Sequence, residues 1–267
     1  MQRVVITGMG VMTPIGLDVE TFWANLTAGK SGIRAIRKFD VTGYKTSIAG
    51  IVEGFDADAV IGRKEARRMD RFCQFAVAAA KQALGDAALE LDKANRERIG
   101  VYIGSGIGGI QTTLDNYRTL LEKGPSRVSP TVVPMMIANM AAAQVSILYG
   151  LKGPLLAPVT ACATGNNAIG EAFRLIRHGG ADAVVAGGTE ATVVDLALAG
   201  FGNATAMSTR NDEPERASRP FDAKRDGFVA SEGAGVLVLE SLDHAISRGA
   251  RIHAELIGYG SSADAYH

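Results

Sequence analysis

The segment VTACATG, residues 159–165, places one of the chain's two cysteines between a short apolar run and several very small residues. Cys162 could be a small buried hydrophobe chosen for its size. Alternatively, it could be a nucleophile held at a turn between a strand and a helix. The free amides and positive dipole end of that helix would favour a thiolate and could hold the oxyanion of a tetrahedral intermediate. Ala161, Ala163 and Gly165 leave room for such a sharp turn, which favours the nucleophile.

A second glycine-rich segment, GSGIGG at 104–109, matches the dinucleotide-binding pattern between a strand and a helix. However, its strand is not the first of the chain, and Glu122, near the expected acidic position, falls in a helix. The earlier candidate, Gly8 and Gly10, has Thr13 in place of the third glycine. We therefore reject a nicotinamide or flavin site and interpret the glycines as allowing two backbones to approach closely.

The four histidines show no metal-binding spacing, and the two cysteines form neither a CxxC pair nor a disulfide framework. His178 is expected in the last turn of a helix, where a positive charge complements the dipole. His244 and His253 are expected at the surface or at an edge, and His267 ends the chain. The sequence therefore predicts neither a metal nor a cofactor.

Positive charge gathers at the start of a helix predicted over 63–85. Its members are Arg63, Lys64, Arg67, Arg68 and Arg71. Cations are disfavoured at a helix N-terminus, and only Glu65 and Asp70 are near enough to compensate. The cluster is either a solvated helix face or a docking patch for an acidic partner.

Apolar runs alternate with helical patterns along most of the chain. Strands are predicted at 3–8, 46–52, 99–104, 154–160, 181–189, 234–240 and 251–259. Helices are predicted at 19–28, 63–85, 109–122, 134–149, 162–178 and 242–248, with a long polar connection over 203–232. Asp18 is the expected N-cap of the first helix. This alternation predicts an α/β protein with a mainly parallel sheet covered by helices on both faces.

Composition narrows the function further. A chain of 267 residues can form one large domain or two small ones, and its 28 basic and 28 acidic residues cancel. Bulk charge therefore indicates neither a nucleic acid nor a membrane surface as partner. The N-terminus has no long apolar leader, and no apolar run approaches the length that spans a bilayer. These features predict a cytoplasmic protein.

The whole chain resembles the N-terminal part of the elongating β-ketoacyl-acyl-carrier-protein synthases, the condensing enzymes of bacterial fatty-acid synthesis. The resemblance rests on RVVITGMG, GSGIGG, VTACATG, VAGGTEA, FGNATAMSTRND, ASRPFDAKRDGFVASEGAG and AELIGYGSSADAYH in family order. It implies a thiolase-like fold, in which two similar βαβαβαββ halves form αβαβα layers. Residues 1–250 would form the N-terminal half, which carries the nucleophile. Residues 251–267 would begin a truncated C-terminal half.

The resemblance also implies the reaction. Cys162 would accept an acyl chain from acyl carrier protein, and the carbanion equivalent left by decarboxylation of malonyl-carrier protein would attack that thioester. Family members need no cofactor for this and act as homodimers. The two catalytic histidines of the family belong to the second half, so no histidine of this chain takes their role. The fragment alone is expected to be inactive.

Further site residues follow from the same resemblance. Ile107, Phe201 and Ile137 of the partner subunit would line the acyl tunnel. Lys64, Arg67, Arg68 and Arg127 would meet the acidic carrier protein, and Asp264 and His267 would begin a loop at the entrance. Thr205 departs from the pattern, because close relatives often carry a basic residue there.

Two other functions remain open. A polyketide ketosynthase would share the cysteine turn, and trials with fatty acyl and polyketide primers would distinguish it from a fatty-acid enzyme. A cysteine at 162 argues against a chain-length-factor partner, because such a partner lacks the nucleophile. A truncated dimerisation or carrier-binding module would have no catalytic role. The codons after His267 would distinguish that module from a complete enzyme.

Overall fold

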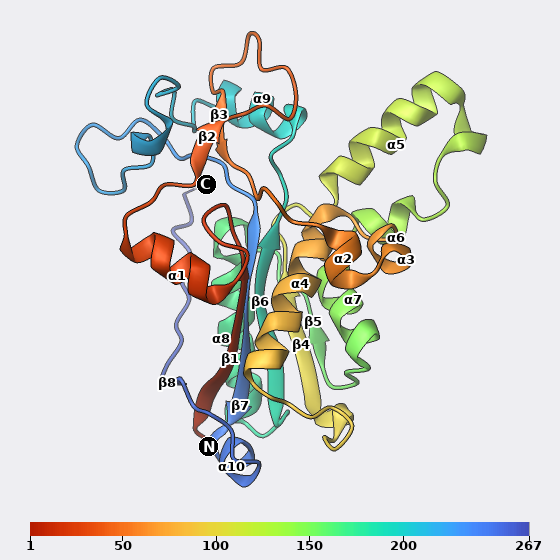
Figure 1. The fold of residues 1–267 in the computed structure, drawn as a ribbon, viewed down its shortest axis with the longest axis vertical. Helices are drawn as coiled ribbons and strands as arrows, with labels where there is room; N and C mark the ends of the chain where they lie inside the picture. The colour runs from red at the N-terminus through yellow and green to blue at the C-terminus, as the bar shows by residue number, and fades with distance from the viewer. Residues whose placement is uncertain (267) are drawn as a thin grey trace.

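A six-stranded mixed sheet forms the centre of the computed structural model, which describes residues 1–266 (Figure 1). The strand order is β5-β4-β6-β7-β1-β8. The strands are β1 (Val4–Met12), β4 (Ile99–Gly104), β5 (Leu155–Leu156), β6 (Ala183–Glu190), β7 (Gly233–Ser241) and β8 (Ala254–Leu256). A separate antiparallel pair joins β2 (Ile33–Ala35) to β3 (Ile48–Gly50).

The expected parallel pairing holds only at one side of the sheet. β4 pairs in parallel with β5 and with β6, whereas β7 lies between β6 and β1 and is antiparallel to both. β8 is also antiparallel to β1. The prediction of a mainly parallel sheet was wrong because a continuously apolar strand shows its burial but not its direction. The strand predicted over 251–259 is also shorter, since only 254–256 pair with β1.

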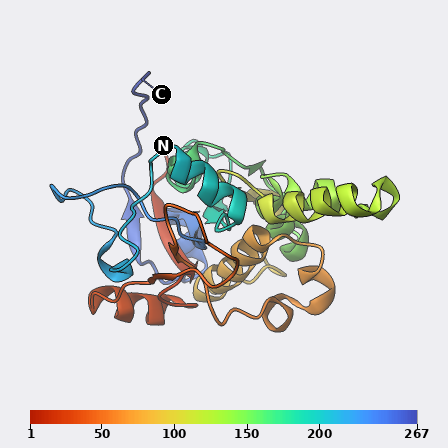
Figure 2. The ribbon, with the colours of Figure 1, turned by 90° about the horizontal axis from the view of Figure 1, so that it is seen from above.

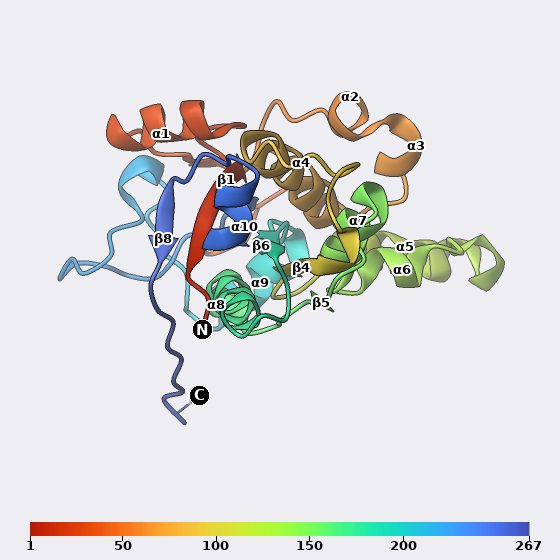
Figure 3. The same cartoon turned by 90° about the horizontal axis from the view of Figure 1, so that it is seen from below.

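Helices cover both faces of this sheet, as the alternating pattern predicted. On one face α4 (Arg71–Asp86) and α7 (Met140–Tyr149) enclose the larger core cluster, in which Phe72 and Phe75 are fully buried. On the other face α8 (Thr164–Arg177) packs its apolar stripe, including Ile176, against β6 and β4. Figure 3 shows α4 and α8 on opposite sides of the strands.

Further helices connect these elements. They are α1 (Val19–Thr27), α2 (Ala57–Ile61), α3 (Arg63–Ala66), α5 (Ile110–Lys123), α6 (Val132–Met136), α9 (Asp195–Asn203) and α10 (Leu242–Ser247). Four 3-10 turns are η1 (Arg96–Arg98), η2 (Pro125–Arg127), η3 (Ala161–Ala163) and η4 (Pro214–Arg216). Asp18 caps α1 as expected, accepting the Thr21 amide at 2.7 Å. α5 projects away from the sheet (Figure 2).

Two predicted helices are each divided in the structure. The helix expected over 63–85 becomes α3 and α4, because buried Asp70 caps α4 through the Phe72 amide at 3.3 Å. The other carboxylate oxygen of Asp70 accepts from the Thr112 amide and hydroxyl at 2.9 and 2.7 Å. The helix expected over 134–149 becomes α6 and α7, since the backbone at Ile137 is extended. Its predicted end at Gly150 is confirmed by a left-handed C-cap.

No helix in residues 1–266 is long and apolar enough to cross a membrane.

A buried carboxylate fastens the antiparallel part of the sheet. Glu240 on β7 is fully buried and accepts from Arg248 at 2.5 Å, from the Thr7 hydroxyl on β1 and from His244 Nδ1 at 2.5 Å. Burial by itself would raise the pKa of this carboxyl, but these hydrogen bonds outweigh it and lower the pKa to about 2. The ionised carboxylate therefore stabilises the folded state at neutral pH.

We expect Glu240→Gln to lower the free energy of unfolding at pH 7 by about 3 kcal/mol, because the folded state prefers the ionised carboxylate. The carboxyl pKa is depressed in the folded state, so this stability is complete above the unfolded pKa and is lost as pH falls toward 2. Urea unfolding at several pH values should show wild type and variant converging in acid. Exposed Glu97→Gln is the matched control. Equal stability of Glu240→Gln and wild type at pH 7 would contradict this account.

Candidate functional site

Cys162 is exposed and lies in the turn η3, immediately before α8. The preceding residue, Ala161, has a φ of +50°, a left-handed conformation that a side chain makes unfavourable. The turn is held by the Thr160 amide, which donates to the Thr164 hydroxyl at 2.9 Å, and by the Thr160 hydroxyl, which donates to Asn167 at 2.6 Å. The predicted sharp elbow is therefore present, with its strain one residue before the thiol.

Glycines let this elbow approach the carboxyl ends of β4 and β6. A Cβ at Gly104 would lie 2.3 Å from the Pro158 carbonyl oxygen, and one at Gly188 would lie 2.9 Å from the Gly165 Cα. Both distances are shorter than a carbon side chain allows. The interpretation of the GSGIGG glycines as sites of close backbone approach is confirmed at Gly104.

The GSGIGG turn binds the carboxylate of Glu190, a residue of the same chain. Partly buried Glu190, at the end of β6, accepts from the Ser105 hydroxyl at 2.9 Å and from the Gly106 amide at 2.8 Å. The Ile107 amide is a further donor to this carboxylate, and the Gly108 amide donates to the Ser105 hydroxyl at 2.9 Å. Successive amides thus form a nest around Glu190, the arrangement that phosphate-binding turns offer to a ligand.

Burial raises the pKa of Glu190 above its ordinary value, although the hydrogen bonds from the turn act in the opposite direction. Sequence reasoning missed Glu190 because the residue follows a buried strand and belongs to no catalytic pattern. The signal was the anion-binding character of the glycine-rich turn together with an acidic residue at the end of the neighbouring strand.

Within one chain, Ile107 and Ile137 lie on neighbouring segments, although the tunnel residue expected beside Ile107 is Ile137 of the partner subunit. The turn that carries Ile107 contacts the segment that carries Ile137, since the Gly109 amide donates to the Met136 carbonyl at 2.9 Å. Ile107 is 42% exposed and Ile137 40%. Phe201 lies on α9, where its ring packs edge-on against Phe228 with centroids 5.2 Å apart. Their role in binding an acyl chain stays a prediction.

The expected carrier-docking residues are all exposed. Lys64 lies on α3, Arg67 and Arg68 follow it, and Arg127 ends η2 beyond the projecting α5. Within residues 1–266 none of these four side chains forms an ion pair. Their positive charge is therefore available to an acidic partner.

Arg71 differs from the rest of the predicted basic cluster. Its guanidinium donates to buried Glu232 at 3.0 Å and to the Val52 carbonyl at 2.7 Å, and lies over the Phe75 ring. Arg71 is thus tied to the core through these contacts, although 30% of its side chain remains exposed. The predicted crowding of cations at the start of one long helix is absent from the described residues, because buried Asp70 caps α4 and Lys64 lies on the separate helix α3.

The histidines take structural positions. His178 follows the last turn of α8 as expected, with Nδ1 2.8 Å from the Arg174 carbonyl oxygen. His253 directly precedes the outer strand β8, so the expectation that it lies at an edge is confirmed. His244 and His253 also contact the carboxylates of Glu240 and Asp86 respectively, and 25% and 14% of their side chains are exposed. Asp264 is exposed and accepts from the Tyr266 amide, whereas His267 lies outside the described residues.

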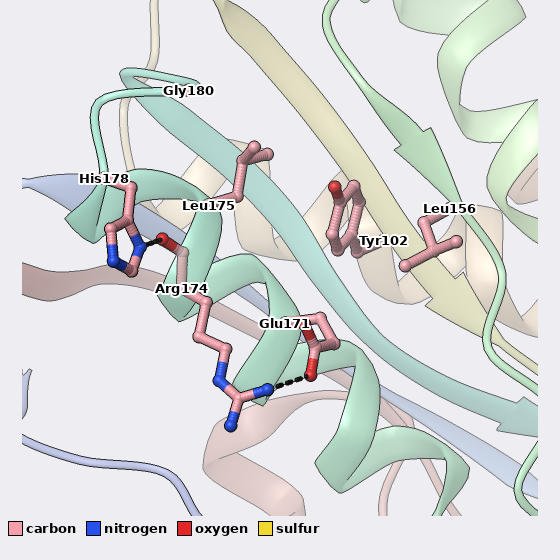
Figure 4. Close-up of a pocket in the computed structure, with 7 residues that line it drawn as sticks. All are labelled: Tyr102, Leu156, Glu171, Arg174, Leu175, His178 and Gly180. Carbon is pink, nitrogen blue, oxygen red and sulfur yellow. Dashed lines mark hydrogen bonds and ion pairs between the residues drawn. The ribbon is translucent and has the colours of Figure 1, made fainter.

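A groove of about 390 Å³ opens beside the C-terminal part of α8 (Figure 4). Tyr102 and Leu156 from the sheet face Arg174, Glu171 and His178 across it, and Arg174 is paired with Glu171. A second hollow of about 300 Å³ lies between α5 and α9. Neither includes Cys162 or any expected tunnel residue.

Comparison with known proteins adds independent evidence. The model of the β-ketoacyl synthase N-terminal domain matches residues 1–245. A Vibrio cholerae protein named 3-oxoacyl-[acyl-carrier-protein] synthase 2 is 53% identical over the whole chain, which covers 64% of that relative. The chain thus spans slightly less than two thirds of the length of the curated relatives it matches.

Solved structures agree with this match. A β-ketoacyl synthase from Burkholderia phymatum superimposes with a TM-score of 0.91 at 40% identity, over all of this chain and 66% of that one. A ketosynthase in complex with its type II PKS acyl-carrier protein, bound to the hexaketide, superimposes with a TM-score of 0.85 at 35% identity, over all of this chain and 64% of that one. These superpositions confirm the predicted thiolase-like fold.

The two cysteines should differ sharply toward a thiol reagent. Cys162 is exposed, whereas burial, with a smaller contribution from Asp70, raises the pKa of the Cys73 thiol on α4 far above its ordinary value. We expect iodoacetamide to modify Cys162 in the folded protein and both cysteines after denaturation. Peptide mass spectrometry of wild type, Cys162→Ala and Cys73→Ala would measure this. Modification confined to Cys73 in the folded protein would contradict the assignment.

Proposed function

Because the chain belongs to the β-ketoacyl synthase family, we propose that the full-length protein condenses an acyl thioester on Cys162 with malonyl-acyl-carrier protein. The product is a 3-oxoacyl-acyl-carrier protein, formed during fatty-acid elongation. One observation carries the proposal: the exposed Cys162 on a strained elbow at the start of α8. The 53% identity to a 3-oxoacyl-[acyl-carrier-protein] synthase 2 supports this substrate class.

The elbow suits the two half-reactions. The Cys162 thiolate attacks the acyl carbonyl, and the carrier thiol leaves as the acyl-enzyme forms. Malonyl thioester then loses CO2, and the resulting carbanion equivalent attacks the acyl-enzyme and releases Cys162. We propose that backbone amides of the elbow stabilise the oxyanion of each tetrahedral intermediate. Because the family resemblance assigns the catalytic histidines to the second half, we assign condensation to the full-length protein and expect residues 1–267 alone to be inactive.

Acyl carrier protein is the proposed partner of Lys64, Arg67, Arg68 and Arg127. Their exposure and lack of ion pairs within residues 1–266 support this, since unpaired surface cations steer an acidic partner. The superposition on a ketosynthase that was solved with its acyl-carrier protein supports the same partner class. We propose a cytoplasmic location for this exchange.

A homodimer through the β5 edge is also proposed. β5 is an outer strand of the sheet, and an unpaired edge presents amides and carbonyls to another chain. Leu155 and Leu156 on this strand are 42% and 41% exposed. Val159, which follows, and Ile147 on α7 are also exposed. This apolar edge supports the expectation that Ile137 of the partner subunit reaches the acyl site.

Polyketide chain building is the second candidate, favoured by the likeness to a type II PKS ketosynthase. Its identity to this chain is 35%, below the 53% of the fatty-acid relative. Competition between a fatty acyl primer and a polyketide primer for Cys162 separates the two functions. Faster acylation by the fatty acyl primer supports the first proposal.

In the full-length protein, Cys162→Ala should abolish condensation, because no thiol remains to hold the acyl chain. Some decarboxylation of malonyl-carrier protein should survive, since that step does not need the acyl-enzyme. The measurement follows 3-oxoacyl product and released CO2 with acyl- and malonyl-carrier protein, and Cys73→Ala is the matched control. Full condensation by Cys162→Ala would overturn the mechanism.

Reversing charge at Lys64, Arg67 and Arg68 should lower kcat/KM for carrier-protein substrates by about tenfold to a hundredfold through slower encounter. Short thioester mimics, which carry no protein, should be used as well as by wild type. The comparison is made at low and high salt, with exposed Lys30→Glu as the control for a change of net charge. Equal losses with both substrate types would show that the three residues serve the fold instead.

A further inference from the structure

Glu190 is an acidic group beside the nucleophile elbow that the proposed chemistry does not use. Its carboxylate gathers the 105–108 turn through the Ser105 hydroxyl at 2.9 Å, the Gly106 amide at 2.8 Å and the Ile107 amide. These donors come from consecutive residues, so one side chain determines the path of the whole turn. A conventional surface carboxylate would have no such effect on a neighbouring backbone.

This turn fills the space between the elbow and the segment that carries Ile137. On one side, the Cβ position of Gly106 lies 3.5 Å from the Ala161 Cα and 3.0 Å from a Glu190 carboxylate oxygen. On the other side, a Cβ at Gly108 would lie 3.1 Å from the Ala138 Cα. Ile107 stands between these two contacts, so a displacement of the turn moves its side chain relative to Cys162.

The elbow has its own supports, which do not involve Glu190. The hydrogen bonds of Thr160 to Thr164 and to Asn167 hold the chain around Cys162. Loss of the Glu190 carboxylate should therefore disturb Ile107 while leaving the thiol in place. This separation allows the position of Ile107 to be tested apart from the reactivity of Cys162.

We propose that Glu190 is a positioning residue that holds the 105–108 turn, and with it Ile107, and thereby determines which acyl chain lengths reach Cys162. The inference rests on the proposed function, since Ile107 is expected to line the acyl site. Glu190 touches neither the reacting atoms nor the thiol in this account. It acts through the backbone that carries Ile107.

The test uses the full-length protein and two thiol reagents, N-ethyl iodoacetamide and N-dodecyl iodoacetamide. Each transfers its carboxamidomethyl group to the Cys162 thiolate with loss of iodide, so the ratio of the two rates reports the space available to an alkyl chain. In Glu190→Gln, an amide group replaces one acceptor and faces the donors of the turn. We expect the long-to-short rate ratio to fall about tenfold, the scale expected for a displacement well below 1 Å, while the short reagent reacts as with wild type.

Ser105→Ala is the second variant, because it removes one ligand of the carboxylate and leaves the charge in place. It should lower the same ratio by a smaller factor, and exposed Glu97→Gln should leave the ratio unchanged. The inference is overturned if Ser105→Ala and Glu190→Gln both keep the wild-type ratio, or if both reagents slow equally. If Glu190→Gln does not fold, Ser105→Ala alone decides.

Failure of the proposed function gives a different result. In that case wild-type protein would not take an acyl group from acyl carrier protein onto Cys162, whatever the alkylation ratio. If acyl transfer is intact, chain-length profiles of kcat/KM with short and long acyl-carrier proteins should shift in Glu190→Gln in the same direction as the alkylation ratio. A shift in KM and kcat that is equal at all chain lengths would overturn the inference.

Discussion

The close approach of three backbone segments at the carboxyl end of the sheet is the constraint on which the site depends. The ends of β4 and β6 and the first turn of α8 meet at distances that exclude a Cβ at Gly104 and at Gly188. This approach brings the elbow that carries exposed Cys162 against the ends of the two strands. The small residues around Cys162 therefore serve the geometry first, and the chemistry follows from it.

The charged side chains near this end of the sheet differ in burial and in the groups they contact. The amides of the GSGIGG turn, which resemble a phosphate-binding loop in sequence, are already occupied by Glu190. Arg71 is likewise paired with the buried carboxylate of Glu232, whereas Lys64, Arg67 and Arg68 are exposed and form no ion pair within residues 1–266. Residue type alone thus does not distinguish a ligand-binding residue from a structural one. The role of each charged side chain depends on the group with which it forms a hydrogen bond or ion pair.

Much of the fold could be predicted because apolar runs and caps act locally. The strand at 99–104, the cap at Asp18 and the end at Gly150 depend on neighbours within a few residues, and each was predicted from the sequence. The directions of the strands and the contacts between distant segments were not predicted correctly. The placement of β7 between β6 and β1 and the bond from Asp70 to Thr112 join segments far apart in the chain, so no local pattern reveals them.

The same difference between local patterns and distant contacts explains which site residues could be predicted. Cys162 could be identified because its elbow is a local motif, whereas Glu190 could not, because its ligands lie 84 and 85 residues away. The strand end that carries Glu190 is nevertheless tied to the core. Thr189, beside Glu190, donates to the Phe72 carbonyl in the first turn of α4, and Asp70 caps that turn while binding Thr112 on α5. The exposed cations of residues 64–68 and the turn around Glu190 are thus held by the same buried helix end. Their relative position is therefore a property of the core rather than of the surface side chains.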